Sequence, residues 1–261
     1  MAASACSASV AAVAGDERAL TAPVFLLRPL PETERLILDG PEGRHAASVK
    51  RLRPGERIDV TDGEGRVAEC VVTSAGRDRL QLEVVARRFI AETQPRVVVA
   101  QALVKGERSE LAVDLLTEVG VDEILPWAAA RCVASWVPEK SGRRWEQAAA
   151  SAAKQARRPR WPIIADAHDS SAVASRIGEC ALALVLHEDA GQPLAKADLP
   201  PSGDVLIVVG PEGGITDEEL AAFEAAGARS VRLGPSVLRA STAGCVAAAV
   251  VLSATGRWSR S

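Results

Sequence analysis

From residue 95 onward, short apolar segments alternate with segments of helical periodicity, and this alternation limits the possible folds more than any other feature. Strands are expected near residues 96–103, 123–126, 181–186, 205–210 and 231–233. Helices are expected near residues 109–119, 143–158, 217–226 and 242–254. Strands that are apolar throughout and separated by helices form a largely parallel sheet with helices on both faces. The sequence therefore predicts an α/β domain over residues 95–261.

Residues 23–92 have a different pattern, typical of a small β domain. RLILDG, ERIDVTDGEGRVAECVV and RLQLEVVARR alternate apolar and polar residues, and Asp62–Gly65 is a hairpin turn between two such runs. One helix is expected from about Glu42 to Leu52, stopped by Pro54 and Gly55. Residues 1–22 lack the basic start and leucine-rich centre of an export signal, so we expect a disordered extension there.

Composition excludes several classes of protein. The apolar runs are much shorter than the roughly 20 residues of a membrane-spanning helix. The 5 cysteines are odd in number, widely spaced and without a C-x-x-C pair, and the 3 histidines lie far apart in sequence. This pattern predicts a cytoplasmic protein with reduced thiols and with no metal centre.

Charge is unevenly distributed in a chain whose net charge is −3. Residues 131–161 hold 8 Arg and Lys against 2 Glu, whereas residues 162–261 hold 7 against 12 acidic residues. A concentrated basic segment in an acidic protein suits a polyanion, and a solvated helix face is the alternative. Trp161, at the end of this segment, could stack on a base or be buried.

The stretch VVGPEGGITDEELAAF, residues 208–223, leads from a strand through a glycine loop into a helix. Loops at the carboxyl ends of parallel strands are where such sheets bind ligands. Gly213 and Gly214 allow positive φ, and Thr216 with Glu219 forms a capping box. No phosphate-binding motif is present, and Glu212 would repel a phosphate. A cationic or neutral ligand fits better, and a plain tight turn remains the alternative.

A second unusual stretch, VRLGPSVLRASTAGCVAAAVVL, covers residues 231–252. Ser241 and Thr242 can cap a helix whose Ala, Gly, Cys and Val residues permit close packing. Arg239 lies between a glycine turn and this helix start, which makes it the strongest candidate for a functional cation. Its alternatives are a salt bridge or a contact with the carbonyl end of another element.

These two stretches, together with QALVKGER, TEVGVDEILPW and AKQARRPRWP in this order, resemble the RsmE family of SPOUT methyltransferases. That family methylates N3 of one uridine in bacterial 16S ribosomal RNA of the small subunit. The resemblance implies an α/β SPOUT domain with a mostly parallel, trefoil-knotted sheet and a small N-terminal PUA-like β-barrel that binds RNA. It also implies S-adenosyl-L-methionine (SAM) as methyl donor and a homodimer with the active site near the dimer interface.

The resemblance also implies roles for individual residues. Those expected to bind the cofactor are Leu186, His187, Gly210, Pro211, Glu212, Gly213, Gly214, Ile215, Leu233, Gly234, Val237 and Leu238. Those expected to contact RNA are Arg44, Lys50, Arg51, Arg53, Arg143, Arg144, Lys154, Gln155, Arg157, Arg158 and Arg160. Arg239 is expected to stabilise the negative charge of a deprotonated uracil. Glu212 is expected to orient donor groups or to accept a proton.

Four positions depart from the family pattern. Ser241 replaces a usual glutamate, Leu115 a lysine, Lys154 an acidic residue and Ser236 an arginine. Two other hypotheses therefore stay open. The first is an RNA-binding ribosome-assembly factor that keeps the fold without catalysis, and the second is a SPOUT methyltransferase acting on another RNA.

Overall fold

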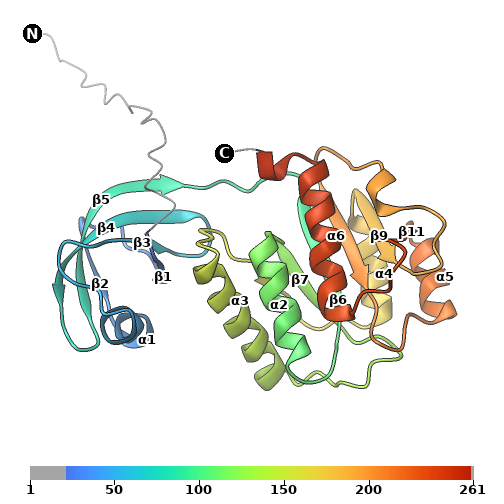
Figure 1. The fold of residues 1–261 in the computed structure, drawn as a ribbon, viewed down its shortest axis with the longest axis horizontal. Coiled ribbons are helices and arrows are strands. Elements are labelled where there is room, and N and C mark those ends of the chain that lie inside the picture. Colours follow the sequence, from blue (N-terminus) through green and yellow to red (C-terminus); the bar gives the residue numbers. More distant parts are fainter. Residues whose placement is uncertain (1–21, 260–261) are drawn as a thin grey trace, which may run out of the picture.

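The structure is a computed structural model that describes residues 22–259, and its strands form two separate sheets (Figure 1). The extension predicted for residues 1–22 lies outside the described residues, except for residue 22. One sheet belongs to the N-terminal part of the chain and the other to the C-terminal part.

The N-terminal part is a curled five-stranded sheet in the order β1-β3-β4-β5-β2. Its strands are β1 (Val24–Leu26), β2 (Arg35–Leu38), β3 (Arg57–Thr61), β4 (Arg66–Ala75) and β5 (Leu80–Phe89). β1 pairs in parallel with β3, and the other pairs are antiparallel. The predicted hairpin turn is confirmed: Asp62 Oδ1 accepts hydrogen bonds from the N–H groups of Glu64 (2.7 Å) and Arg66 (3.1 Å).

The single helical segment of this part differs in its bounds from the predicted 42–52. It begins as α1 (Gly40–Arg44), with Pro41 in its first turn, and continues as a π-helical segment, η2 (His45–Val49). Proline favours the first helical turn because the N–H groups there have no intrahelical partner. The helix therefore starts two residues earlier than predicted and ends before Leu52.

The C-terminal part is a six-stranded sheet in the order β11-β9-β10-β6-β7-β8, in which every pair is parallel. Its strands are β6 (Arg96–Ala102), β7 (Glu123–Trp127), β8 (Ile163–Ile164), β9 (Leu182–Leu186), β10 (Asp204–Val209) and β11 (Arg229–Val231). The predicted parallel sheet is confirmed. β8 was not predicted, and β11 ends two residues before the predicted strand does.

Helices cover both faces of this sheet (Figure 1). The bounds of these helices are α2 (Arg108–Val119), α3 (Arg143–Gln155), α4 (Ser170–Glu179), α5 (Asp217–Ala225) and α6 (Ala240–Ala254). Short helical turns are η3 (Pro138–Gly142), η4 (Leu194–Lys196) and η5 (Arg257–Ser259). Val97 and Val99 of β6 pack in the cluster with α2, α3 and α6, whereas Val98 packs with α4 and α5. Burial on both sides explains why the strands are apolar throughout.

Close packing of α6 is confirmed, but its predicted cap is wrong. A Cβ on Gly244 would lie 3.1 Å from Leu116 Cδ2 and 3.3 Å from Val209 Cγ2, so only glycine fits there without adjustment. The helix begins at Ala240, and Arg239 is its N-cap residue. Thr242 Oγ1 instead donates backward to the Arg239 carbonyl at 3.1 Å, and Ser241 is buried.

The two parts of the chain touch through the segment that follows α3. The backbone N–H of Trp161 donates to the Gly63 carbonyl (2.9 Å), and the side-chain Nε of Arg160 donates to the Ile90 carbonyl (2.8 Å). The Trp161 ring is half-buried with the Arg28 guanidinium 5.7 Å from its centre, which favours the packing role weighed for this tryptophan. The trefoil knot implied by the resemblance stays a prediction.

Candidate functional site

Three loops at one edge of the parallel sheet form the candidate site. They follow β9, β10 and β11, which are neighbours in the sheet, so their carboxyl ends meet at the same edge. Between the loops lies a cavity of about 680 Å³. Every residue predicted to bind a cofactor lines this cavity, as does Arg239. Segments that are separate in sequence, 186–188, 210–215 and 233–238, are therefore brought to one place.

The glycine loop is shaped by its glycines and by the capping box behind it. Gly214 has φ +76° and donates its N–H to the Pro211 carbonyl at 2.9 Å. A Cβ on Gly210 would lie 2.7 Å from Ile215 Cγ1, closer than carbon atoms can approach. Thr216 and Glu219 form the predicted capping box, which fixes the start of α5.

The resemblance implies that this cavity binds SAM, and replacing Gly210 with alanine is then expected to weaken that binding by about tenfold or more, because the added methyl group would push Ile215 and the loop out of position. Isothermal titration with SAM measures the effect. Gly191→Ala is the matched control, since a Cβ there meets no atom within 4 Å. Equal affinities for the two variants would show that the shape of the loop at Gly210 does not matter for binding.

Two residues that support the loop were not predicted as part of the site. Arg131 lines the cavity, and its Nη1 donates to the carbonyls of Gly213 (3.0 Å) and Ile215 (3.5 Å). Glu219 Oε1 accepts from Ala130 N–H (2.8 Å) and from Ser170 Oγ (2.6 Å). The only sequence signal for Arg131 was its place at the start of the basic segment 131–161, and for Glu219 its place in the capping box.

Glu219 makes the stability of this region depend on pH. Burial raises its pKa, but hydrogen bonds from Ser170, Ala130 and Thr216 outweigh burial, so the pKa lies below the ordinary 4.5. A carboxyl with a lowered folded-state pKa stabilises the protein above its unfolded pKa, and this contribution is lost as pH falls through the folded pKa.

We therefore expect the difference in unfolding free energy between wild type and Glu219→Gln to be full near pH 7 and to shrink below about pH 4.5. Urea unfolding at a series of pH values measures it. Glu218→Gln, an exposed neighbour in the same turn, is the control. A difference that is constant from pH 7 to pH 3 would contradict the assigned role.

Both signs of charge surround the cavity. The acidic residues that line it are Glu188, Asp189, Glu212 and Asp217, and the basic ones are Arg108, Arg131, Arg232 and Arg239. Glu212 and Arg239 are both exposed. Among residues 22–259 the Arg239 guanidinium has no ion-pair partner, so the salt bridge considered for it is not formed there. The side chain is available to a ligand.

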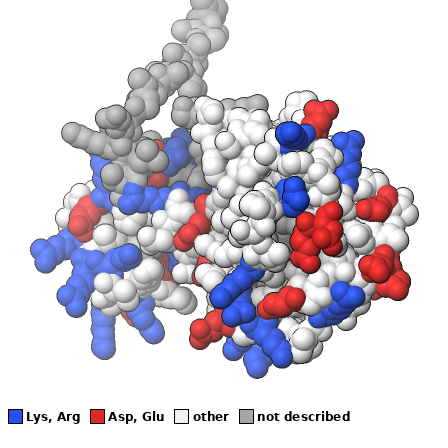
Figure 2. All heavy atoms as spheres, turned by 45° about the vertical axis from the view of Figure 1, so that its right-hand side comes forward, with Lys and Arg blue, Asp and Glu red and all other residues white. Residues whose placement is uncertain are grey.

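The residues predicted to contact RNA fall into two groups. Those with exposed side chains are Arg44, Lys50, Arg51, Arg53, Arg143, Arg144, Gln155 and Arg157. Lys154, Arg158 and Arg160 are partly buried and have partners within the protein. In the exposed group, Arg144 also has a partner, because its Nη1 lies 3.5 Å from Glu110 Oε1. Lys154 Nζ lies 2.7 Å from Glu42 Oε1, and Arg160 also lies 3.4 Å from Glu92 Oε1. Figure 2 shows mostly basic side chains on this face of the small N-terminal part and a mixture of acidic and basic side chains on the larger part.

Arg158 differs most from its predicted role. Its guanidinium donates to the carbonyls of Thr117 and Val121, the latter at 2.9 Å, and burial lowers its pKa to about 10. The charged group therefore faces the end of α2 inside the protein and not a surface where a phosphate would bind.

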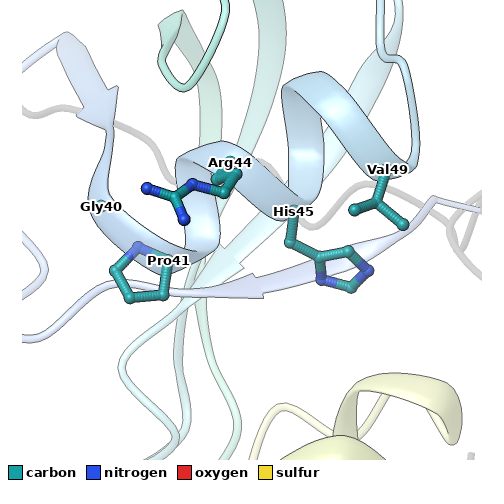
Figure 3. A pocket seen from close by; sticks show the side chains of 5 residues that line it. All are labelled: Gly40, Pro41, Arg44, His45 and Val49. Carbon is teal, nitrogen blue, oxygen red and sulfur yellow. The ribbon is translucent and has the colours of Figure 1, made fainter.

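A smaller hollow of about 360 Å³ lies beside α1 and η2 in the N-terminal part. At one end of the hollow the Arg44 side chain extends toward Pro41, and at the other end lie His45 and Val49 (Figure 3). His45 also packs edge-on against Phe25, with ring centres 5.9 Å apart. Arg44 is therefore open to solvent at the rim of this hollow.

Among residues 22–259, no three His, Cys, Asp or Glu side chains are grouped so that they could hold a metal ion. Over that range no helix has the length and apolar character needed to cross a membrane.

Comparison with known proteins adds to this geometry. Residues 91–252 match the family model described as an RNA methyltransferase domain, and residues 38–85 match that of an RNA methyltransferase PUA domain. Ribosomal RNA small subunit methyltransferase E of Mycobacterium bovis is 46% identical over 250 residues, which cover 93% of this chain and 95% of the relative. This chain belongs to the same family. The Bacillus subtilis member is 28% identical over 82% of this chain and 88% of its own length.

Solved structures agree with this family assignment. The methyltransferase E of Neisseria gonorrhoeae, solved with S-adenosyl methionine bound, has a TM-score of 0.77 and 25% identity, covering 89% of this chain and 98% of that one. A Legionella pneumophila protein with bound SAM has a TM-score of 0.79 and 25% identity, with the same coverage. The predicted α/β fold with an N-terminal PUA-like domain is confirmed.

Proposed function

We propose that this protein transfers the methyl group of SAM to N3 of a uridine in the 16S rRNA of the small ribosomal subunit. The observation that carries the proposal is that one cavity is surrounded by the loops after β9, β10 and β11 and by Arg239, which has no ion-pair partner among residues 22–259, in a chain of this family. The division of labour we propose is RNA binding by residues 23–92 and methyl transfer by residues 95–261, in a cytoplasmic homodimer.

The cavity suits SAM in size and charge. Its volume of about 680 Å³ lies within the range of small-molecule sites, roughly 300–1,000 Å³. SAM supplies an electrophilic methyl group on a sulfonium and carries no phosphate. Glu188, Asp189 and Glu212 would favour the cationic groups of this donor, whereas they would repel a nucleotide phosphate. The apolar ends of β9 and β10, Leu186 and Val209, would contact its adenine and ribose.

Arg239 is placed to act on the uracil. N3 must lose its proton to become a good nucleophile, and the resulting negative charge spreads over O2 and O4. The exposed guanidinium of Arg239 would stabilise that charge as it develops. Glu212, also exposed on the cavity wall, would orient donor groups or accept the proton.

The exposed basic residues provide the RNA contacts in this proposal. Phosphate contacts from Arg and Lys give affinity and orientation without reading sequence. The residues that would bind RNA phosphates on the N-terminal part are Arg44, Lys50, Arg51 and Arg53. Those on the C-terminal part are Arg143, Arg144 and Arg157. The target base must be unstacked from its neighbours, and the free energy of unstacking is lowest in an irregular region of the RNA.

Mass-spectrometric mapping of rRNA tests the proposal. Small-subunit rRNA from a strain lacking this gene should lack one N3-methyluridine, and the purified protein with SAM should restore it in vitro. A protein that does not bind SAM at millimolar concentration would instead be a non-catalytic assembly factor. An unchanged 16S rRNA with a modification lost from tRNA would point to a different RNA substrate.

A further inference from the structure

Gln101 has a buried side-chain amide that contacts the first residue of α6, the helix that begins at the candidate site. It is in β6 next to the end of β10, where its register partner is Val209. Its exposed fraction is only 1%, in a strand whose other buried residues are apolar. A polar side chain in the middle of such a sheet is unusual, because burying it costs free energy unless it is fully hydrogen-bonded.

In the side-chain amide of Gln101, the nitrogen is hydrogen-bonded and the oxygen is not. Its Nε2 donates to the carbonyl of Ala240 at 3.3 Å and to that of Ala102 at 3.2 Å. Its Oε1 has no hydrogen-bond partner among the described residues. The amide orientation follows from this environment, since the flipped amide would place oxygen against both carbonyls. Gly244 leaves room for the side chain, because a Cβ there would lie 3.4 Å from Oε1.

The bond to Ala240 connects the sheet to the residue that follows Arg239. Ala240 is the first residue of α6, and Arg239 is its N-cap. The Arg239 carbonyl accepts the N–H groups of Thr242 and Ala243, both at 2.9 Å. The Arg239 side chain itself has no ion-pair partner among residues 22–259. Its position therefore depends on how the first turn of α6 is held.

We propose that Gln101 is a positioning residue for methyl transfer: its side-chain amide holds the first turn of α6 and so sets where Arg239 meets the substrate. This inference rests on the proposed function. An unpaired buried oxygen destabilises the fold, and an apolar residue of similar shape would remove it. This cost offsets part of what the two long hydrogen bonds of Nε2 contribute, so the amide adds little net stability.

Gln101→Met tests the inference because methionine has a similar shape and no hydrogen-bonding amide. With SAM and 16S rRNA from the deletion strain, we expect kcat to fall at least tenfold. The dissociation constant for SAM should stay within threefold of wild type, and the thermal midpoint should not fall. Gln147→Met, on the exposed face of α3, is the matched control and should match wild type in all three measurements.

A second variant, Gln101→Glu, should show a pH dependence of kcat that would not arise if Gln101 served only to pack the core. The neutral carboxyl group can donate to the Ala240 carbonyl, whereas the ionised form would face two carbonyl oxygens. Burial among these acceptors favours the neutral form. We therefore expect the ratio of variant to wild-type kcat to fall as pH rises from 6 to 9, and this variant decides the matter if Gln101→Met does not fold.

The outcomes separate the inference from the function on which it rests. Wild-type protein that methylates 16S rRNA together with a Gln101→Met kcat within twofold of wild type would overturn the inference alone. A loss of SAM affinity in proportion to kcat, or a pH-independent ratio for Gln101→Glu, would also overturn it. Wild-type protein that leaves 16S rRNA unmethylated would overturn both.

Discussion

Replacing Arg239 with alanine is expected to lower kcat for RNA methylation by about 10²–10³-fold, while the dissociation constant for SAM stays within about tenfold of wild type. The size follows from the loss of one donor aimed at a charge that develops only in the transition state. Because Arg239 is exposed and has no ion-pair partner among residues 22–259, its removal leaves no unpaired carboxylate there and should not destabilise the fold.

Steady-state methylation of 16S rRNA at saturating substrates measures kcat for this variant, and calorimetry measures SAM affinity. Arg229→Ala is the matched control, since Arg229 is an exposed arginine in β11 that does not line the cavity. Wild-type turnover in Arg239→Ala would remove this residue from the mechanism. A large loss of SAM affinity at unchanged kcat would instead make it a cofactor-binding residue.

The parts of the fold that the sequence predicted well are those determined by local pattern. The apolar strands β6, β9 and β10 are buried on both faces, and continuous apolar runs carry that information directly. The capping box of Thr216 and Glu219 and the hairpin turn at Asp62 depend on residues a few positions apart. The strand pattern also placed the glycine loop at the carboxyl edge of the parallel sheet, whereas the grouping of the three ligand loops came from the family resemblance.

The parts that were missed depend on contacts between distant segments. α4 buries only Val173 and Ile177, which is too short an apolar pattern to identify a helix. β8 has two residues and exists because it pairs with β7. Arg131 supports the glycine loop from a segment 82 residues away in sequence. No local pattern encodes such a contact.

The basic segment 131–161 illustrates the same limit for charge. Its composition predicted one surface for RNA, but a cation binds whichever acceptor the fold brings to it. Arg157 remains exposed, whereas Arg158, the next residue, turns inward to carbonyls about 40 residues earlier in the chain. Counting charges therefore identifies a candidate surface without saying which members belong to it. Substitution of these two neighbours separates the two roles.

Arg158→Ala is expected to lower the free energy of unfolding by about 2–3 kcal/mol, because it leaves two carbonyl groups without their charged donor. For a chain of this size the thermal midpoint should fall by roughly 5–10 °C. Arg157→Ala should leave the midpoint almost unchanged but lower the slope of log affinity against log salt for RNA by about 1. Calorimetry and filter binding at several salt concentrations measure the two effects. A stable Arg158→Ala variant with a reduced salt slope would place its guanidinium on the RNA.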